Sequence, residues 1–224
     1  MRPAGAKGLF VVIEGPEGAG KSTQIALLAE RLQESGRSAL LSREPGGTQT
    51  GDAIREILLD PTREITPLAE FLLYSASRAQ LVEEVIAPAL NAGTDVLCDR
   101  FASASVAYQG HGRGLDLALI DDLNQRATGG LTPDLTVLLD IEPVAGLARA
   151  ARRSSHDRLE AAGIDFHRRV REGFLAQARG NPSWLVIDAS TSPDEVAARL
   201  WNGLEALINQ RAGAADGAPV VQDV

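Results

Sequence analysis

Short apolar runs alternate with amphipathic stretches along the chain. The apolar runs predict buried strands at 9–14, 38–42, 94–99, 134–140 and 184–188. Apolar positions three and four residues apart predict helices between them, namely 21–36, 52–60, 67–91, 115–127, a helix from Pro143, 160–179 and 192–208. Strands this apolar are typical of a mostly parallel sheet with helices on both faces. The sequence therefore predicts an α/β fold with a five-stranded parallel sheet.

The alternation continues without an internal repeat or an interdomain linker. We therefore predict one domain over residues 1–210. The final helix starts at a capping box, in which Ser192 is the N-cap and Glu195 follows three residues later. Residues 211–224 are small and aperiodic and contain glycine and proline, so we predict a disordered tail.

A glycine-rich loop, GPEGAGKS at 15–22, separates the first strand from the first helix. Gly15, Gly20, Lys21 and Ser22 fit the pattern G-x-x-x-x-G-K-[ST]. The glycines let backbone N–H groups converge on an anion, and the helix N-terminus adds partial positive charge. The lysine can reach the β- and γ-phosphates, and the serine hydroxyl can ligate Mg²⁺. A plain strand–helix turn would not select Lys-Ser after the last glycine, so the loop predicts a nucleoside triphosphate site.

Composition limits the classes of partner that the protein could bind and the compartment in which it could work. The formal net charge of −8 and a pI near 5.0 argue against a nucleic-acid binder, which needs a basic face. A single cysteine, Cys98, excludes an internal disulfide and fits a reducing compartment. The apolar stretch near the N-terminus is too short to span a membrane and has no signal-peptide cleavage region. We therefore expect a cytoplasmic protein with neither a membrane nor a nucleic-acid partner.

The reaction must be read from residues outside the loop, because GTPases and motor ATPases share it. The guanine-reading motif N-K-x-D is absent, and Lys7 and Lys21 are the only lysines. Asp99 and Arg100 end the third predicted strand, where ligands bind in open α/β sheets. This position would bring the carboxylate near the phosphate loop and the guanidinium into the crevice. A surface ion pair at the strand end is the alternative.

Two further clusters allow two interpretations each. The polar segment 153–158 lies among Arg152, Arg153 and Arg158, and it fits either a lid at about 150–160 that closes over ATP or a solvated loop. Tyr74 and Arg78 share one helix face. They could stack on a base and bond its edge, or they could be a core tyrosine beside a surface arginine.

Six segments in a fixed order and spacing make the sequence resemble the thymidylate kinase family over about residues 8–208. They are EGPEGAGKST (14–23), REPGGT (43–48), DRF (99–101), AYQGHGRG (107–114), PDLTVLLD (133–140) and DRLE (157–160). The resemblance implies a P-loop nucleoside monophosphate kinase fold with a lid segment. It also implies phosphorylation of dTMP to dTDP by Mg-ATP in dTTP biosynthesis, and a homodimer. A kinase for another pyrimidine monophosphate and a non-catalytic nucleotide-binding module are the alternatives.

The resemblance also assigns roles around the donor nucleotide. Residues that would hold the ATP phosphates are Gly15, Pro16, Glu17, Gly18, Ala19, Gly20, Lys21, Ser22 and Thr23. Ser22 and Asp99 would lie at the Mg²⁺ ion. Arg153 matches a lid arginine of a bacterial subgroup whose phosphate loop has no basic residue at its variable positions. We expect the catalytic groups to be Lys21, Arg100, Arg153 and Glu17.

The acceptor site is assigned in the same way. Arg43, Arg55 and Arg100 would surround the acceptor phosphate, and Glu17 would lie near the 3′-hydroxyl and that phosphate. Tyr74 matches the ring that stacks on thymine, and Arg78 matches the arginine that bonds the base edge. Ser105 and Gln109 match the thymine-recognition segment, and Tyr108 matches a tyrosine that disfavours a 2′-hydroxyl.

Overall fold

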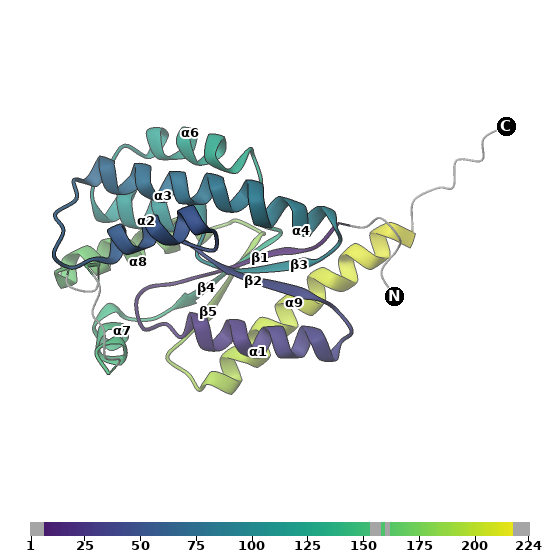
Figure 1. Cartoon of the computed structure of the whole chain (residues 1–224). Helices are drawn as coiled ribbons and strands as arrows, with labels where there is room; N and C mark the ends of the chain where they lie inside the picture. The colour runs from purple at the N-terminus through teal and green to yellow at the C-terminus, as the bar shows by residue number, and fades with distance from the viewer. Residues whose placement is uncertain (1–6, 153–157, 160–161, 217–224) are drawn as a thin grey trace.

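The computed structural model describes residues 7–152, 158–159 and 162–216. Its five strands form one parallel sheet in the order β2-β3-β1-β4-β5 (Figure 1). The strands are β1 Phe10–Glu14, β2 Ala39–Arg43, β3 Asp95–Asp99, β4 Leu135–Asp140 and β5 Trp184–Asp188. The prediction of a five-stranded parallel α/β sheet is therefore confirmed.

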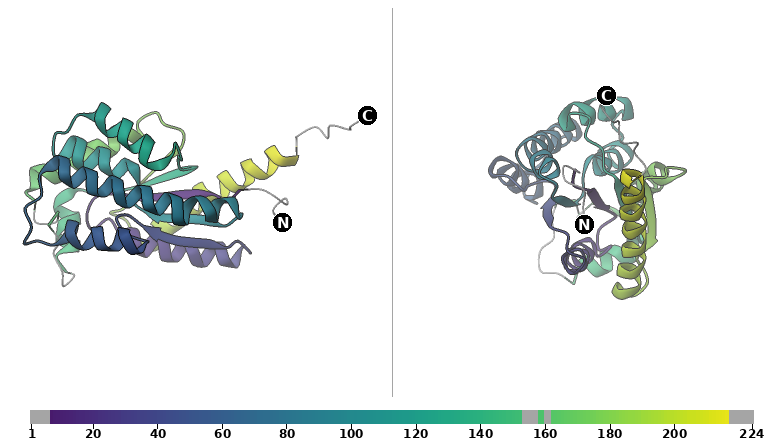
Figure 2. Two further views of the ribbon diagram at one scale, coloured as in Figure 1. Left: turned by 45° about the horizontal axis from the view of Figure 1, so that its top comes forward. Right: turned by 90° about the vertical axis from the view of Figure 1, so that its right-hand side faces the viewer.

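Helices cover both faces of this sheet (Figure 2). The helical elements are α1 Lys21–Glu34, α2 Gln49–Leu59, α3 Pro67–Leu81, η1 Val82–Ile86, α4 Ala87–Asn91, α5 Ala102–Ser105, η2 Val106–Gly112, α6 Leu117–Thr128, α7 Pro143–Ala150, α8 Ile164–Ala178 and α9 Pro193–Asp216. The elements η1 and η2 are π-helical turns. Helices α1 and α9 lie against one face, and α3, η1, α4 and α8 lie on the other.

The central strand β1 shows why its sequence is apolar throughout. Val11 and Ile13 belong to a core cluster with residues of α1 and α9. Phe10 and Val12 point to the opposite face and pack with residues of α3, η1 and α4. Because successive side chains alternate between two buried faces, no position in the strand's apolar run tolerates water.

The strand order positions the phosphate loop. Strand β1 lies between β3 and β4, so the loop after Glu14 emerges between the carboxyl ends of two neighbouring strands. The register pairs Ile13 with Asp99, which brings the end of β3 beside the start of the loop. Open α/β sheets bind ligands at such a place, where the chain direction of the connections reverses.

Two helical regions differ from the sequence prediction. The stretch 67–91 is not one uniform helix, because the wide turn η1 separates α3 from α4. Pro88 has no N–H to donate to the preceding turn, and the wider turn accommodates it. Segment 102–112, to which the pattern assigned no element, forms α5 and η2. Its glycines disfavour helix, so the sequence pattern did not indicate this one. Gly110 and Gly112 allow close packing, because a Cβ at Gly110 would lie 2.5 Å from Leu117 and a Cβ at Gly112 would lie 2.7 Å from Phe166.

The C-terminal boundary also needs a correction. Helix α9 continues through Asp216, past residue 210, where the predicted tail begins. The alanines of 211–216 favour helix, and Arg211 forms an ion pair with Asp134 that holds this turn against the body. The capping box at its start is confirmed, because Ser192 N–H donates to Glu195 at 3.0 Å and Glu195 N–H donates to Ser192 Oγ at 3.3 Å. Residues 217–224 lie outside the described residues.

Among the helices of the described residues, none combines the length and the apolar character needed to cross a membrane.

One close approach in this fold gives a test. The Cα of Gly146 on α7 faces the phosphate loop so closely that a Cβ would lie 2.3 Å from the carbonyl oxygen of Glu17. We expect Gly146→Ala to lower the free energy of unfolding by about 1–3 kcal/mol and to raise the KM for ATP, because the loop must move. Urea unfolding and steady-state kinetics measure both.

Gly213→Ala is the matched control for this substitution. Gly213 lies in α9, and a methyl group added at its Cα would meet no atom within 4 Å. Alanine there should leave the KM for ATP unchanged and raise stability by about 0.5–1 kcal/mol. Equal effects of the two substitutions would contradict the proposed contact.

Candidate active site

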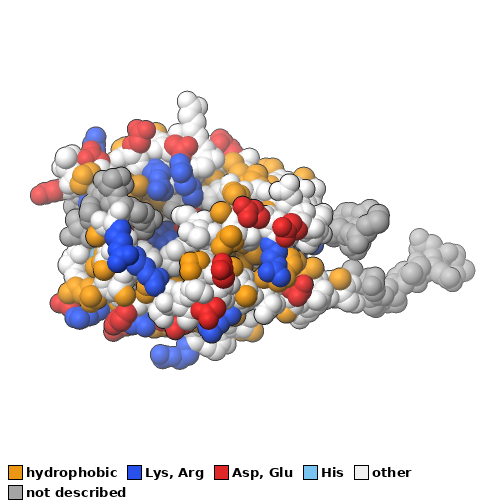
Figure 3. Space-filling model, turned by 90° about the horizontal axis from the view of Figure 1, so that it is seen from below, with side chains coloured by type: hydrophobic (Ala, Val, Ile, Leu, Met, Phe, Trp, Pro, Cys, Tyr) orange, Lys and Arg blue, Asp and Glu red, His pale blue; other side chains and the backbone are white. Residues whose placement is uncertain are grey.

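A cavity of about 520 Å³ opens at the carboxyl ends of the strands. Basic side chains gather around a hollow in the left half of the face shown in Figure 3. The cavity is lined by Glu17, Gly18, Gly20, Lys21, Ser22, Thr23, Arg43, Glu44, Pro45, Arg55, Leu59, Tyr74, Asp99, Arg100, Ala104, Ser105, Tyr108, Gln109, Arg149 and Leu159. It therefore brings the phosphate loop together with segments from four other parts of the chain.

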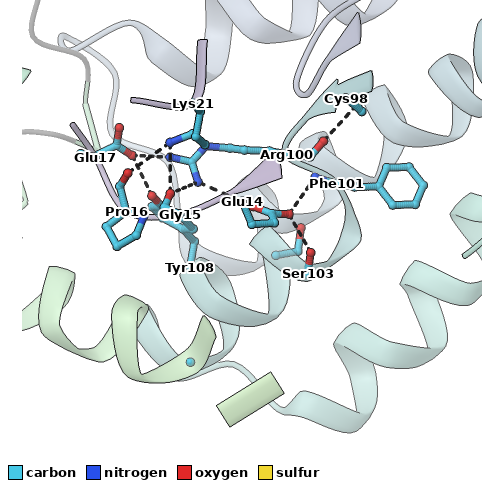
Figure 4. A network of polar contacts seen from close by, with 12 residues as sticks. Glu14, Gly15, Pro16, Glu17, Lys21, Cys98, Arg100, Phe101, Ser103 and Tyr108 are labelled. Atoms are coloured by element: carbon cyan, nitrogen blue, oxygen red, sulfur yellow. Dashed lines mark hydrogen bonds and ion pairs between the residues drawn. The ribbon is translucent and has the colours of Figure 1, made fainter. Parts of the chain in front are cut away.

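The phosphate loop has the backbone that its glycines predict. Gly15, Gly18 and Gly20 have φ values of 149°, 71° and 91°, which side-chain-bearing residues rarely adopt. Lys21 begins α1 and folds back over the loop, donating from Nζ to the carbonyls of Gly15 and Pro16 at 3.1 Å each (Figure 4). Burial lowers the pKa of Lys21, and the nearby Arg100 charge lowers it further.

Arg100 crosses from the end of β3 to the phosphate loop. Its φ of 69° is in the left-handed region and turns the side chain back over the cavity. The backbone N–H donates to Ile13 O at 3.1 Å. The guanidinium donates to the carbonyl of Gly15 at 3.1 Å and to Glu17 Oε1 at 2.8 Å. The crevice position predicted for this arginine is the one that the structure has.

Glu17 is the acceptor at the centre of this contact. The hydroxyl of Tyr108 donates to the same Oε1 at 2.7 Å, and the Arg100 guanidinium carbon lies 4.7 Å from the centre of the Tyr108 ring. Burial alone would raise the pKa of Glu17, but the positive charges of Arg100 and Lys21 outweigh it and lower the pKa to about 2.

A second carboxylate, missed from the sequence, supports the same turn. Glu14 is fully buried at the end of β1, and its Oε1 accepts from the N–H of Phe101 at 2.9 Å and from the hydroxyl of Ser103 at 2.7 Å. Its Oε2 lies 4.0 Å from Arg100. Burial raises the pKa of Glu14. A glutamate inside an otherwise apolar strand was the available signal.

Ser22 and Asp99 present oxygen atoms beside the loop. Ser22 Oγ lies 3.5 Å from Asp99 Oδ2, and both residues line the cavity. No group of three or more His, Cys, Asp or Glu side chains in the described residues could hold a metal ion. One hydroxyl and one carboxylate nevertheless fit Mg²⁺, a hard cation that takes its remaining ligands from phosphates and water.

Three of the four predicted base-binding residues form part of the cavity wall, where α3, α5 and η2 contribute to it. Tyr74, Ser105 and Gln109 line the cavity, but Arg78 does not. Arg78 is only 1% exposed, so it is not the surface arginine of the alternative interpretation. It lies behind the wall and donates to Glu44 at 2.9 Å, to Asn124 at 2.5 Å, and to Ser105 Oγ at 3.0 Å and the carbonyl of Phe101 at 3.3 Å.

Two of the remaining predicted arginines line the cavity, and the third lies outside the described residues. Arg43 and Arg55 line the cavity; Arg43 lies 3.5 Å from Asp52, and Arg55 donates to the carbonyl of Pro45 at 2.8 Å. Arg153, the predicted lid arginine, lies outside the described residues. Gly15, Pro16 and Ala19 belong to the loop but do not line the cavity.

Several lining residues were not predicted, namely Glu44, Pro45, Leu59, Ala104, Arg149 and Leu159. Glu44 and Pro45 belong to the REPGGT segment, which was the available signal for them. Burial raises the pKa of Glu44 to about 7, although the adjacent Arg78 opposes the rise. Arg149 lies in the last turn of α7 and donates to the carbonyls of Ala189 at 2.7 Å and Ser190 at 3.3 Å. The available sequence signal for Arg149 was the arginine-rich run that follows α7.

Comparison with known proteins decides the family. The sequence model of the thymidylate kinase family matches residues 13–200. The chain belongs to the thymidylate kinase family. A thymidylate kinase of Deinococcus radiodurans is 58% identical over 197 residues, covering 88% of this chain and 96% of the relative. One from a Synechococcus strain is 56% identical over 200 residues, with 88% and 94% covered.

A solved structure agrees with this assignment. The crystal structure of thymidylate kinase from Ehrlichia chaffeensis superposes with a TM-score of 0.74 at 32% identity, covering 89% of this chain and 99% of that one. The predicted thymidylate kinase resemblance and the P-loop nucleoside monophosphate kinase fold are therefore confirmed.

The lowered pKa of Glu17 gives a pH prediction. A carboxyl group with a pKa of about 2 in the folded state and an ordinary value of 4.5 stabilises the fold above pH 4.5. This contribution is lost as the pH falls from about 4.5 towards 2. We expect the difference in free energy of unfolding between the parent and Glu17→Gln to shrink over this window.

Urea unfolding at several pH values between 7 and 2 measures that difference. The other carboxyl groups titrate in both proteins, so their contributions cancel in the difference in free energy of unfolding. A difference that stays constant across the whole range would contradict the assigned pKa.

Proposed function

We propose that this chain transfers the γ-phosphoryl group of ATP to dTMP, forming dTDP for dTTP synthesis. One observation carries the proposal: a single cavity joins a phosphate loop to a wall with an aromatic ring and an amide, Tyr74 and Gln109. The two substrates of a nucleotide kinase need these two ends, one for a triphosphate and one for a base. Membership of the thymidylate kinase family supports the assignment of donor and acceptor.

Residues 15–23 would hold the donor phosphates. The carbonyl contacts that occupy Lys21 are weak enough to exchange for phosphate oxygens, which are stronger, charged acceptors. Ser22 and Asp99 would hold Mg²⁺, which, when bound, screens the charge of the phosphates. The backbone N–H groups at the start of α1, which no side chain caps, would take the rest of that charge.

Arg100 would act between the two substrates. It already touches the donor loop at Gly15 and lies in the cavity with Arg43 and Arg55, which would bind the acceptor phosphate. Glu17 would orient the acceptor through its 3′-hydroxyl. No covalent intermediate is required, because in-line transfer needs positioning and charge neutralisation. The lid arginine Arg153 stays a prediction.

Tyr74 would stack on the base, and Ser105 and Gln109 would face its edge. Arg78 would act from behind this wall, through the side chains that it holds. Tyr108, fixed by its bond to Glu17, would crowd a ribose 2′-hydroxyl. The absence of a nucleic-acid partner and a cytoplasmic location stay predictions.

An acceptor panel tests the activity. With saturating Mg-ATP, we expect dTMP to give the highest kcat/KM when compared with UMP and CMP, measured as ADP release coupled to dTDP formation. Faster turnover of UMP or CMP would favour the alternative kinase. ATP hydrolysis that no acceptor accelerates would favour a non-catalytic module.

The role of Arg100 gives a second test. Arg100→Lys keeps the charge but cannot bridge Gly15 and Glu17 as the guanidinium does. We expect kcat for dTMP to fall by about 100-fold, the scale of losing one preorganised charge-stabilising donor. Arg126→Lys changes an exposed helix pair with Asp122 and should leave kcat unchanged. An Arg100→Lys enzyme with full kcat would remove this arginine from the catalytic groups.

We propose that the chain forms a homodimer through α3. Leu68 and Leu72 lie one turn apart on this helix and are 46% and 47% exposed, an apolar pair that a second copy would cover. We expect Leu72→Glu to give a monomer in size-exclusion chromatography with light scattering. Val144→Glu alters an exposed residue on a different helix, α7, and should stay dimeric. A monomeric parent protein, or a dimeric Leu72→Glu variant, would contradict the proposal.

A further inference from the structure

We propose that Glu70 is a positioning residue that fixes the amide of Gln109 and so selects acceptor bases that carry a ring N–H. This inference rests on the proposed function, because it concerns the base of the acceptor. Glu70 was not singled out in the sequence. It lies one helical turn before Tyr74 and two before Arg78, so it shares their face of α3.

The carboxylate of Glu70 is fully buried and surrounded by donors. Gln109 Nε2 donates to Oε1 at 2.8 Å. Arg113 donates to Oε1 from Nε at 3.3 Å and to Oε2 from its terminal nitrogen at 3.1 Å. Arg158 forms an ion pair with Oε2 at 2.6 Å. A buried carboxylate with two guanidinium partners offers only acceptor atoms to the glutamine.

This contact fixes which way the amide of Gln109 points. If the amide flipped, its oxygen would face the oxygen of Glu70, and both atoms would lack a hydrogen. The amide nitrogen must therefore face Glu70, and the amide oxygen must face away. Within the described residues, no protein group donates to Gln109 Oε1, and the residue lines the cavity. The cavity thus meets an acceptor oxygen and the second N–H of the same amide.

That pair of atoms matches one class of pyrimidine edge. Thymine and uracil present N3–H beside a carbonyl oxygen, a donor next to an acceptor. Cytosine presents the reverse pattern, an N3 acceptor next to a 4-amino donor. An amide held in one orientation forms two hydrogen bonds with thymine or uracil, but it sets acceptor against acceptor and donor against donor with cytosine. An amide free to flip accommodates both kinds of base. Sites with fixed polar groups discriminate well, because the wrong ligand leaves these groups unpaired.

The protein fixes this orientation without help from a ligand. Arg158 also donates from Nε to the carbonyl of Leu58 at 3.1 Å, and its neighbour Leu159 lines the cavity with Leu59. Arg113 lies over the ring of Phe166, with its guanidinium carbon 4.6 Å from the ring centre. Both arginines are thus anchored on separate elements and hold the carboxylate in place. Glu70 is preorganised before any base arrives.

Glu70→Gln tests the inference, because a glutamine can donate as well as accept and would let Gln109 flip. We expect the ratio of kcat/KM for dTMP to that for dCMP to fall by about tenfold, the effect of one well-placed hydrogen bond. The change should appear mainly as a higher KM for dTMP, with kcat at saturation within about threefold of the parent. A merely structural role would lower both acceptors together.

Arg113→Gln is the matched control. It removes one charge from the same buried cluster but leaves the bond between Glu70 and Gln109, so the dTMP-to-dCMP ratio should not change. A ratio that falls equally in both variants would overturn the inference, because charge and not amide orientation would then govern selectivity. An unchanged ratio in a folded Glu70→Gln enzyme would also overturn it.

If Glu70→Gln does not fold, Glu70→Asp decides the question. It keeps the negative charge for both arginines but withdraws the oxygens from Gln109, so the ratio should again fall. An unchanged ratio in a folded Glu70→Asp enzyme would overturn the inference. A parent enzyme that does not phosphorylate dTMP would instead overturn the proposed function, so the two failures are distinguishable.

Discussion

The Arg100 guanidinium joins the phosphate loop, the end of β3 and the segment that carries Tyr108. It bonds the carbonyl of Gly15 and the carboxylate of Glu17, and Tyr108 lies beneath it and shares that carboxylate. The left-handed backbone at Arg100 makes this reach possible, and Glu14 holds the following turn. A site for two phosphorylated substrates must concentrate positive charge, and here carboxylates neutralise that charge until the phosphates arrive.

The apolar runs predicted the sheet because the central strands β1, β3 and β4 are buried on both faces. The edge strands β2 and β5 are only partly buried but are still mostly apolar in sequence. Prediction from the sequence pattern failed where local pattern and tertiary packing disagree. Glycines at 110 and 112 argue against helix, yet they allow η2 to approach α6 and α8. Arg211 looked like the start of a tail, but its ion pair with Asp134 depends on a partner 77 residues away. Such contacts leave no periodic trace in the sequence.

The same distinction applies to the site. Residues carried by contiguous motifs, such as Lys21 and Arg100, could be placed from the sequence, because backbone and register bring them together. The spacing of Tyr74 and Arg78 gave their common face but not their depth. Arg78 is buried since Glu44, from a distant segment, supplies its counter-charge. Glu70 was missed because nothing local marks a glutamate whose partners lie on η2 and beyond α7.

Three buried carboxylates therefore share one task. Glu14 holds the turn of Arg100, Glu44 holds Arg78, and Glu70 holds Gln109. Burying these groups is costly, as the raised pKa values of Glu14 and Glu44 show. Buried ion pairs add little net stability compared with apolar packing, so stability alone does not account for them. Their role in orienting other side chains accounts for them, because each carboxylate fixes a side chain whose direction the chemistry requires. In this way an acidic chain can build a site for anions.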